Sequence, residues 1–245
     1  MHAWFVSDIH IKEVTDQRAV TFLSFLHSLG VSRKATHLYL LGDIFDVWVG
    51  HGKAFEQKFI LIVEEIRKLK QRGVEVIYFE GNHDVYVEKF WKRFDIPVFV
   101  GIHSFNVNSW KLRLTHGDYI NPQDTTYLKW LQIMRSGWMR FLALNLPSVF
   151  WYELGQYASG KSRANSQRQR IDLEDYLREK FRTYVKQQSD QNDFDFLVSG
   201  HIHVRDDYTY TKPTGRQVRG INLGSWFNDI KAFYIDEIGG SWVEL

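Results

Sequence analysis

The sequence predicts an α/β protein in which βαβ units form a sheet that carries polar side chains at the ends of its strands. Short runs rich in β-branched and aromatic residues alternate with longer segments of helical periodicity. The apolar runs end repeatedly in Asp, Asn or His, close to glycines that allow the chain to turn. The chain has 245 residues, 44% of them hydrophobic and 24% charged, which suits one large domain or one domain with an inserted lobe.

The first strand is expected at residues 3–6, and a helix that begins after Asp16 and ends at Gly30 is expected to follow it. Asp16 is a favourable N-cap, and Gly30 supplies a stop signal. Apolar residues at helical spacing predict the buried face of this helix. They are Val20, Leu23, Leu26 and Leu29.

A second helical segment lies between predicted strands at residues 37–41 and 74–79, and Gly73 closes it. Its apolar stripe consists of Phe55, Phe59, Ile62, Ile66 and Leu69. Open α/β sheets bind ligands at the edge where the carboxyl ends of their strands meet. The three strands of this half of the chain therefore predict one polar site at that edge.

The second half of the chain departs from this alternation. Strands are expected at residues 111–115 and 194–199, but the segment between them, residues 119–188, is predicted to be helical. We interpret this segment as an inserted helical lid over the site. The core is then formed by residues 1–118 and 189–245.

Five polar clusters each follow a predicted strand. They are Asp8-x-His10, Gly42-Asp43-x-x-Asp46, Gly81-Asn82-His83-Asp84, His116-Gly117-Asp118 and Gly200-His201-x-His203. Any one of them alone is compatible with an ordinary turn. Buried carboxylates and imidazoles, however, are costly unless they are paired or bind a metal. Five such clusters in succession therefore favour a metal site.

The ligand types indicate which metals would bind. Carboxylates, imidazoles and one amide oxygen, in a chain without cysteine, suit two divalent ions such as Mn²⁺, Fe²⁺, Zn²⁺ or Co²⁺. Two ions about 3.5–4 Å apart can polarise a phosphoryl group and generate hydroxide. The clusters thus predict a two-metal site for phosphoryl chemistry.

Charge and composition exclude several classes of protein. The formal charge of +2 is too balanced for a surface that tracks nucleic acid, so no nucleic-acid partner is expected. The lack of cysteine excludes a disulfide scaffold and thiolate chemistry. We expect no secretory signal at the start of the chain. The longest nearly apolar stretch, residues 141–151, is well short of the roughly 20 residues that span a bilayer.

The predicted lid combines aromatic and cationic residues. Residues 119–170 include nine aromatic residues and seven bases against two acids, a net charge of +5 compared with +2 for the whole chain. Such a lobe suits a substrate with both a phosphate and apolar chains, and it also suits contact with an anionic membrane surface. The alternative is that the aromatic residues form the core of the lobe and the bases a solvated helix face.

The five clusters resemble those of the calcineurin-like metallophosphoesterase superfamily over residues 3–203. The resemblance implies a four-layer α/β/β/α sandwich with a two-metal site. It assigns one ion to Asp8, His10, Asp43 and His203, and the other to Asp43, Asn82, His116 and His201. It also implies that His83 steadies the phosphate or protonates the leaving group while Asp84 orients its ring. Asp46 and Asp118 are expected to be supporting residues.

Three further segments are similar to the UDP-2,3-diacylglucosamine hydrolase family: residues 140–147 (RFLALNLP), 162–168 (SRANSQR) and 222–226 (NLGSW). This family cleaves the pyrophosphate of UDP-2,3-diacylglucosamine to lipid X (2,3-diacylglucosamine 1-phosphate) and UMP in lipid A biosynthesis, typically with Mn²⁺. The similarity implies substrate contacts by Asn82, His83, Asp124, Asn165, Arg168 and His201.

The same similarity implies an acylated sugar-nucleotide substrate and a cytoplasmic protein peripherally associated with the inner membrane; no obligate protein partner is inferred. The family usually has Arg where this chain has His83, so another nucleotide or lipid-linked phosphodiester or pyrophosphate stays open as the substrate. Two rival functions also stay open. One is a broader phosphodiesterase, nuclease or phosphoprotein phosphatase, and the other is a catalytically silent binding module.

Overall fold

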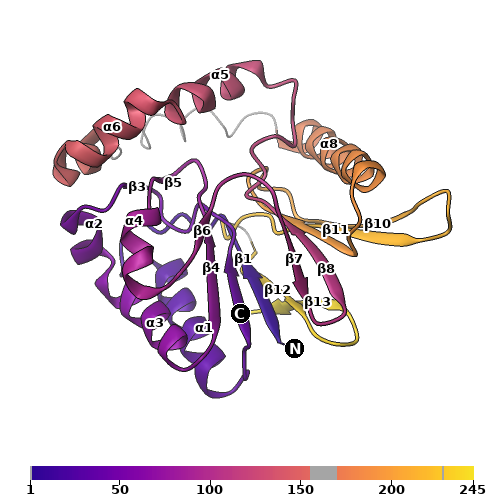
Figure 1. The fold of residues 1–245 in the computed structure, drawn as a ribbon, viewed down its shortest axis with the longest axis horizontal. Coiled ribbons are helices and arrows are strands. Elements are labelled where there is room, and N and C mark those ends of the chain that lie inside the picture. The colour runs from indigo at the N-terminus through magenta and orange to yellow at the C-terminus, as the bar shows by residue number, and fades with distance from the viewer. Residues whose placement is uncertain (1, 155–169, 228) are drawn as a thin grey trace.

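The computed structural model describes residues 2–154, 170–227 and 229–245, and its core consists of two sheets with helices outside them (Figure 1). The first sheet has six strands in the order β13-β12-β1-β2-β4-β6. The four strands from β1 to β6 are parallel, and β12 and β13 extend the sheet as antiparallel strands. Their bounds are β1 Ala3–Val6, β2 His37–Leu40, β4 Glu75–Phe79, β6 Val98–Phe99, β12 Lys231–Ile235 and β13 Gly240–Glu244.

The second sheet has five strands in the order β10-β11-β9-β8-β7. Its three central strands are parallel, and the two edge strands, β10 and β7, are antiparallel to their neighbours. The bounds are β7 His103–Val107, β8 Trp110–Leu114, β9 Phe196–Ser199, β10 Asp206–Thr211 and β11 Gln217–Asn222. A separate pair of short parallel strands is formed by β3 (Trp48–Val49) and β5 (Asp84–Val85).

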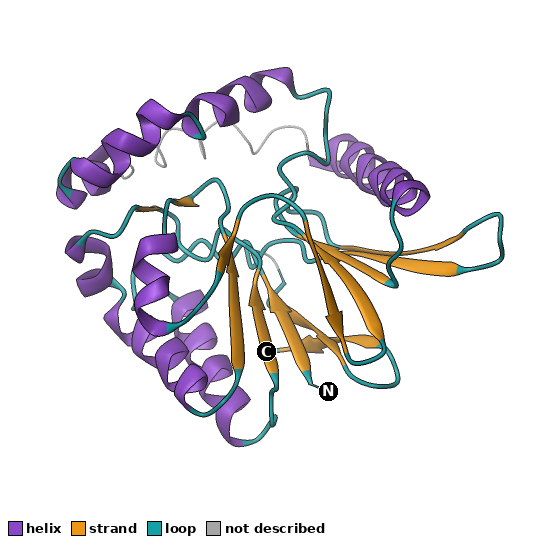
Figure 2. Cartoon of the chain, viewed as in Figure 1, coloured by secondary structure: helices purple, strands orange, loops and turns teal. Residues whose placement is uncertain are grey.

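The helices lie outside these sheets and above one of their ends (Figure 2). They are α1 Gln17–Val31, α2 Lys53–Lys58, α3 Ile60–Gln71, α4 Glu88–Trp91, the 3₁₀ helix η1 Lys92–Phe94, α5 Thr125–Met134, α6 Gly137–Asn145 and α8 Arg170–Gln191. Residues 148–154 are helical as well. Within the described ranges, each helix is too short or too polar to cross a bilayer.

Three apolar clusters separate the layers. The inner faces of the two sheets meet in one cluster, which includes Phe5, Phe79 and Phe196. A second cluster packs α1 and α3 against the outer face of the first sheet. In the third, Phe181 and Val185 of α8 pack against the outer face of the second sheet. The layer order is therefore helix, sheet, sheet, helix, which confirms the predicted α/β/β/α sandwich.

Two details of α1 differ from the sequence prediction. Val20 was expected on its buried face but is 46% exposed, and the buried residues are instead Ala19, Phe22, Phe25, Leu26 and Leu29. The bulky rings of Phe22 and Phe25 bury more apolar area than Val20 and Leu23, so they turn that face of the helix inward. Gly30 does not end the helix, which continues to Val31.

The second helical segment is divided into α2 and α3 at Phe59, whose φ of −107° and ψ of 23° interrupt the helix. All five residues of the predicted stripe are nevertheless buried, because the break leaves them on the same side of the chain. Gly73 has a φ of +87°, so it ends the segment in a left-handed conformation as predicted.

One buried carboxylate ties together the loops that follow β2 and β4. Asp84 Oδ1 accepts hydrogen bonds from the backbone N–H groups of Asp43 (3.0 Å) and Gly81 (2.8 Å). Asp84 Oδ2 accepts from the N–H of Ile44 (2.8 Å) and the hydroxyl of Tyr78 (2.5 Å). Asp84 is fully buried, so these four donors replace the water that its carboxylate has lost. Both loops are thereby held at fixed positions.

We expect Asp84→Asn to destabilise the fold, because an amide NH₂ group would face donors that need an acceptor. The free energy of unfolding should fall by about 2–4 kcal/mol, whereas Tyr78→Phe, which removes only one donor, should cost about 1 kcal/mol. Urea unfolding followed by tryptophan fluorescence measures both. If Asp84→Asn unfolded at the wild-type urea concentration, this carboxylate would not hold the loops together.

Candidate metal centre

The strand ends bring the five polar clusters to one edge of the sandwich, beneath α5 and α6 (Figure 1). Asp8 follows β1, Asp43 follows β2 and Asn82 follows β4, while His116 and His201 follow β8 and β9 of the other sheet. Parallel strands fix this convergence because their carboxyl ends lie at the same edge. The site is therefore built where the two sheets meet.

The donor atoms of the first predicted ligand set lie within a few ångströms of one another. His203 Nε2 is 3.3 Å from Asp8 Oδ1 and 3.1 Å from His10 Nε2. His10 Nε2 is in turn 3.7 Å from Asp43 Oδ2 and 4.0 Å from Asp8 Oδ1. Four atoms that carry lone pairs thus converge on one small volume.

The second predicted set shares the same oxygen of Asp43. His116 Nε2 is 3.7 Å from Asp43 Oδ2 and 3.3 Å from Asn82 Oδ1. His201 Nδ1 is 3.1 Å from Asn82 Oδ1 and 3.3 Å from His116 Nε2. Asp43 therefore stands between the two sets, 3.7 Å from an imidazole nitrogen on each side.

These separations suit donors that share a divalent ion. Donors about 2.0–2.2 Å from one ion, at tetrahedral or octahedral angles, lie about 2.8–3.6 Å from one another. Most of the separations in the two sets fall in or close to this range. The donors are also of the right kind, since imidazole, carboxylate and amide groups are typical ligands of such ions.

The backbone at these residues is unusual. Five of the seven predicted ligands have positive φ: Asp8 (50°), His10 (51°), Asp43 (53°), His201 (72°) and His203 (58°). Residues other than glycine rarely adopt this region, and such strain gathers at functional sites. The loops therefore give up backbone stability in order to direct these side chains inward.

Burial and charge set the protonation of the site. Burial lowers the pKa of His10 to about 3 and that of His201 to about 4, so both rings are neutral near pH 7 and offer lone pairs. Burial acts in the same direction on His116, but the carboxylates of Asp43 and Asp118 outweigh it and raise its pKa to about 9. Burial alone would raise the pKa of Asp43, yet the facing imidazoles, chiefly His116, hold it below its usual range.

The structure corrects the role predicted for Asp84. This carboxylate is occupied by backbone donors and Tyr78, and it is the carbonyl oxygen of Asp46, 2.7 Å from His83 Nδ1, that orients the His83 ring. Since a carbonyl can only accept, Nδ1 carries the proton and Nε2 is left for other chemistry. The sequence could not identify the right partner. Asp84 is the next residue along the chain, whereas Asp46 is brought to His83 only by the fold.

The residues predicted to contact substrate fall into three groups. Asn82, His83 and His201 belong to the cluster itself. Asp124 lies at the start of α5, where its side chain accepts a hydrogen bond from the N–H of Tyr127 (2.9 Å). Asn165 and Arg168 lie outside the described residues.

Two aromatic residues at the site were not identified from the sequence. Tyr127 of α5 reaches down to the cluster, where its hydroxyl bonds to Asp118 and lies 3.5 Å from Asn82 Oδ1. The ring of Phe227 stacks on that of His10 with their centroids 5.3 Å apart, and the guanidinium of Arg18 lies 4.5 Å from the Phe227 centroid. Aromatic residues are so frequent in this chain that nothing in the pattern distinguishes these two.

Comparison with known proteins agrees with this geometry. The family model described as calcineurin-like phosphoesterase matches residues 1–205. Two curated relatives named UDP-2,3-diacylglucosamine hydrolase are those of Neisseria meningitidis, 26% identical over 99% of this chain and 98% of the relative, and of Tolumonas auensis, 25% identical over 95% and 92%.

Among solved structures, an archaeal phosphodiesterase matches the whole chain over its own full length, with a TM-score of 0.52 and 12% identity, a likeness of fold. Together, the matched family, the sandwich and its cluster of ligand-type residues identify the chemistry of the protein. This chain belongs to the calcineurin-like phosphoesterase family and is a metal-dependent phosphoester hydrolase.

Proposed function

We propose that the two sets of donors hold two divalent cations, with Mn²⁺ expected and Fe²⁺, Zn²⁺ or Co²⁺ as alternatives. Asp8, His10, Asp43 and His203 would hold one ion, and Asp43, Asn82, His116 and His201 the other. Such a pair supplies Lewis acidity toward a phosphoryl oxygen and a nucleophile for hydrolysis. The observation that carries this proposal is the position of Asp43 Oδ2, 3.7 Å from a nitrogen of each set.

The chain itself supplies groups beside the metal sets. The Asp46 carbonyl fixes the His83 ring through Nδ1–H, so that Nε2, once it has taken up a proton, can donate a hydrogen bond to a phosphate oxygen or transfer that proton to the leaving group. Tyr127 lies beside Asn82, and the centroids of its ring and of the His201 ring are 4.8 Å apart. Both residues would orient a phosphate above the cluster.

We propose UDP-2,3-diacylglucosamine as the substrate, which hydrolysis at the pyrophosphate would split into lipid X and UMP. The names of the curated relatives support this choice. The part of the predicted lid that α5 and α6 form supports it as well, because these helices lie over the phosphoester site and carry exposed apolar side chains, as two acyl chains would require, whereas α8 belongs to the outer layer of the sandwich. Among these are Ile133 (51% exposed), Trp138 (57%) and Phe141 (65%).

The same exposed apolar residues support peripheral attachment to the cytoplasmic face of the inner membrane. Aromatic side chains beside bases such as Lys129 suit the interface of an anionic bilayer. The acylated substrate would then be taken directly from the bilayer in which it resides. Neither nucleic acid nor an obligate protein partner is needed for this function.

Asp43→Asn should remove the shared ligand. We expect metal content to fall from two ions to fewer than one per chain, and kcat/KM to fall at least about 10²-fold. Elemental analysis of purified protein measures the first and a hydrolysis assay the second. Asp193→Asn, which alters an exposed ion pair, is the matched control. Full metal content and full activity in Asp43→Asn would disprove the proposed centre.

His83→Ala should separate chemistry from metal binding, because His83 stands beside the donor sets without belonging to either. We expect kcat to fall about 10²-fold or more while the metal content stays at the wild-type value. Parallel kinetic and elemental measurements on one preparation give both numbers. An unchanged kcat would remove His83 from the proposed mechanism.

A substrate panel tests the proposed specificity. UDP-2,3-diacylglucosamine should be hydrolysed with a kcat/KM at least about 10²-fold above those of dinucleoside polyphosphates, DNA and phosphopeptides, because only it engages both the cluster and the apolar lid. Release of UMP in the presence and absence of detergent is the readout. A preference for any other member of the panel would support the broader phosphodiesterase, nuclease or phosphatase function instead.

A further inference from the structure

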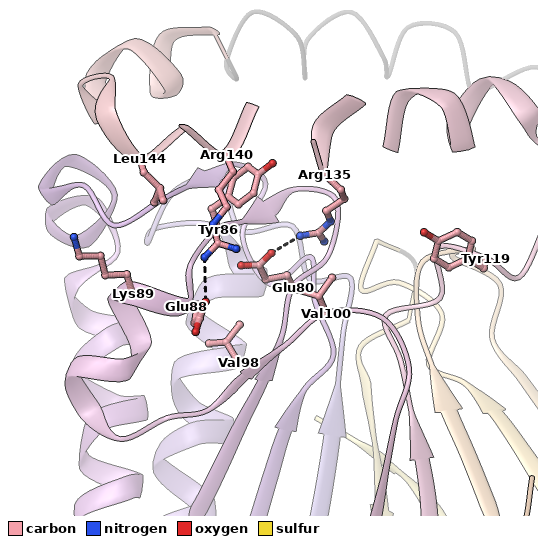
Figure 3. A pocket seen from close by; sticks show the side chains of 10 residues that line it. All are labelled: Glu80, Tyr86, Glu88, Lys89, Val98, Val100, Tyr119, Arg135, Arg140 and Leu144. Carbon is pink, nitrogen blue, oxygen red and sulfur yellow. Dashed lines mark hydrogen bonds and ion pairs between the residues drawn. The ribbon is translucent and has the colours of Figure 1, made fainter. Parts of the chain in front are cut away.

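Glu80 follows β4 directly, and its carboxylate is buried. It belongs to neither proposed set of metal ligands, so metal binding does not account for its burial. Its side chain is 3% exposed. Oε1 accepts a hydrogen bond from the N–H of Val87 (2.8 Å), and Oε2 forms an ion pair with Arg135 (Figure 3). A buried carboxylate is costly unless a cation lies close to it. The position of Arg135 is therefore energetically linked to the loop that begins at Glu80.

Arg135 belongs to the lid, as the residue directly after α5. Its backbone N–H donates to the carbonyl of Leu131 (2.8 Å), so its main chain is fixed to the helix. Its guanidinium makes a second contact with the core, since Nη2 donates to the carbonyl of Gly81 (3.1 Å). Beside it, the Tyr86 hydroxyl donates to the carbonyl of Met134. The end of α5 is thus joined to the loop between β4 and β5.

Gly81 is wedged between this lid contact and the metal centre. A Cβ atom added to it would lie 2.1 Å from Asp43 Oδ1, so the backbone of Gly81 packs directly on the shared carboxylate. Its N–H donates to Asp84 (2.8 Å), and its carbonyl accepts from Arg135. Asn82 is the next residue. Whatever fixes the peptide between Gly81 and Asn82 therefore also fixes Asn82 relative to Asp43.

We propose that Arg135 is a positioning residue that acts from the lid on the metal centre. By holding the Gly81 carbonyl, its guanidinium places Asn82 Oδ1 opposite His116 and His201, and it places His83 beside Asp46. The ion pair with Glu80 holds the guanidinium in the orientation that this requires. The inference rests on the proposed two-ion site, but it is independent of the proposed substrate.

Neighbouring residues offer a matched control. Arg140 of α6 also joins the lid to the core, through an ion pair with Glu88 (3.5 Å). Arg135 and Arg140 both line a cavity of about 440 Å³ (Figure 3). The Arg140–Glu88 pair is exposed, with 58% and 57% of the two side chains accessible, and it attaches Arg140 to Glu88 rather than to the loop of Asn82. Its loss should therefore leave the metal centre unchanged.

The experiment is a calorimetric titration of the metal-free full-length protein with Mn²⁺, together with urea unfolding and hydrolysis of bis-p-nitrophenyl phosphate. Asn82→Ala identifies the binding step that belongs to the second set of ligands. In Arg135→Met we expect that step to weaken about 10–100-fold and kcat to fall similarly, with KM changed less than about twofold. Arg140→Met should change none of these values more than about twofold.

Two further variants separate positioning from stability. Glu80→Gln with Arg135→Met removes both charges, so it should recover the urea midpoint that Arg135→Met loses but not the affinity for Mn²⁺, because Gly81 still lacks its donor. Arg135→Lys should recover part of the affinity, since one ammonium cannot reproduce the two-pronged contact.

The inference is overturned if the double variant recovers the second binding step together with stability, if Arg140→Met weakens that step as much as Arg135→Met does, or if Arg135→Met binds Mn²⁺ like the wild type. A wild-type protein that takes up no pair of ions would instead refute the proposed function, so the two failures are distinguishable.

Discussion

The burial of the Asp43 carboxylate is the constraint on which the rest of the centre depends. Only 1% of this residue is accessible, and a charge in that position must be compensated by neighbouring groups. The fold provides imidazoles on two sides, from His10 in one donor set and His116 in the other. Because the two imidazoles come from different sheets, the requirement also determines how the carboxyl ends of β1 and β8 must approach each other.

Two side chains, Asp84 and Arg135, hold the loops that surround Asp43. Asp84 holds them from the interior of the sandwich through four donors, and Arg135, directly after α5, holds the backbone beside Asn82. Both devices are ionisable side chains, buried or partly buried, that bond to backbone groups. Such contacts are stronger than exposed ion pairs and are more directional. They suit a site whose donor atoms must be positioned to about half an ångström.

The sequence predicts the part of this arrangement that follows from strand ends. The apolar runs that terminate in Asp8, Asp43 and Asn82 are β1, β2 and β4, and their convergence needs only the geometry of parallel strands. The periodicity of α3 is strong enough to survive the break at Phe59, whereas in α1 the competition between Val20 and the larger Phe22 is decided by packing.

The contacts made across the fold are what the sequence cannot supply. Three contacts depend on distances between segments that are far apart in the chain. Asp46 rather than Asp84 orients His83, Tyr127 reaches Asn82, and Arg135 bonds to Gly81. Charge or aromaticity marks these residues as candidates, but many others among residues 119–170 share those properties. Only the assembled tertiary structure shows which of them reach the centre.

The most direct test of a carboxylate shared between two ions is electron paramagnetic resonance of the protein loaded with two equivalents of Mn²⁺. If one oxygen of Asp43 bridges the pair, the two spins must interact, and we expect the spectrum of an exchange-coupled dimanganese centre. A spectrum of isolated, magnetically independent Mn²⁺ ions at full occupancy would contradict it.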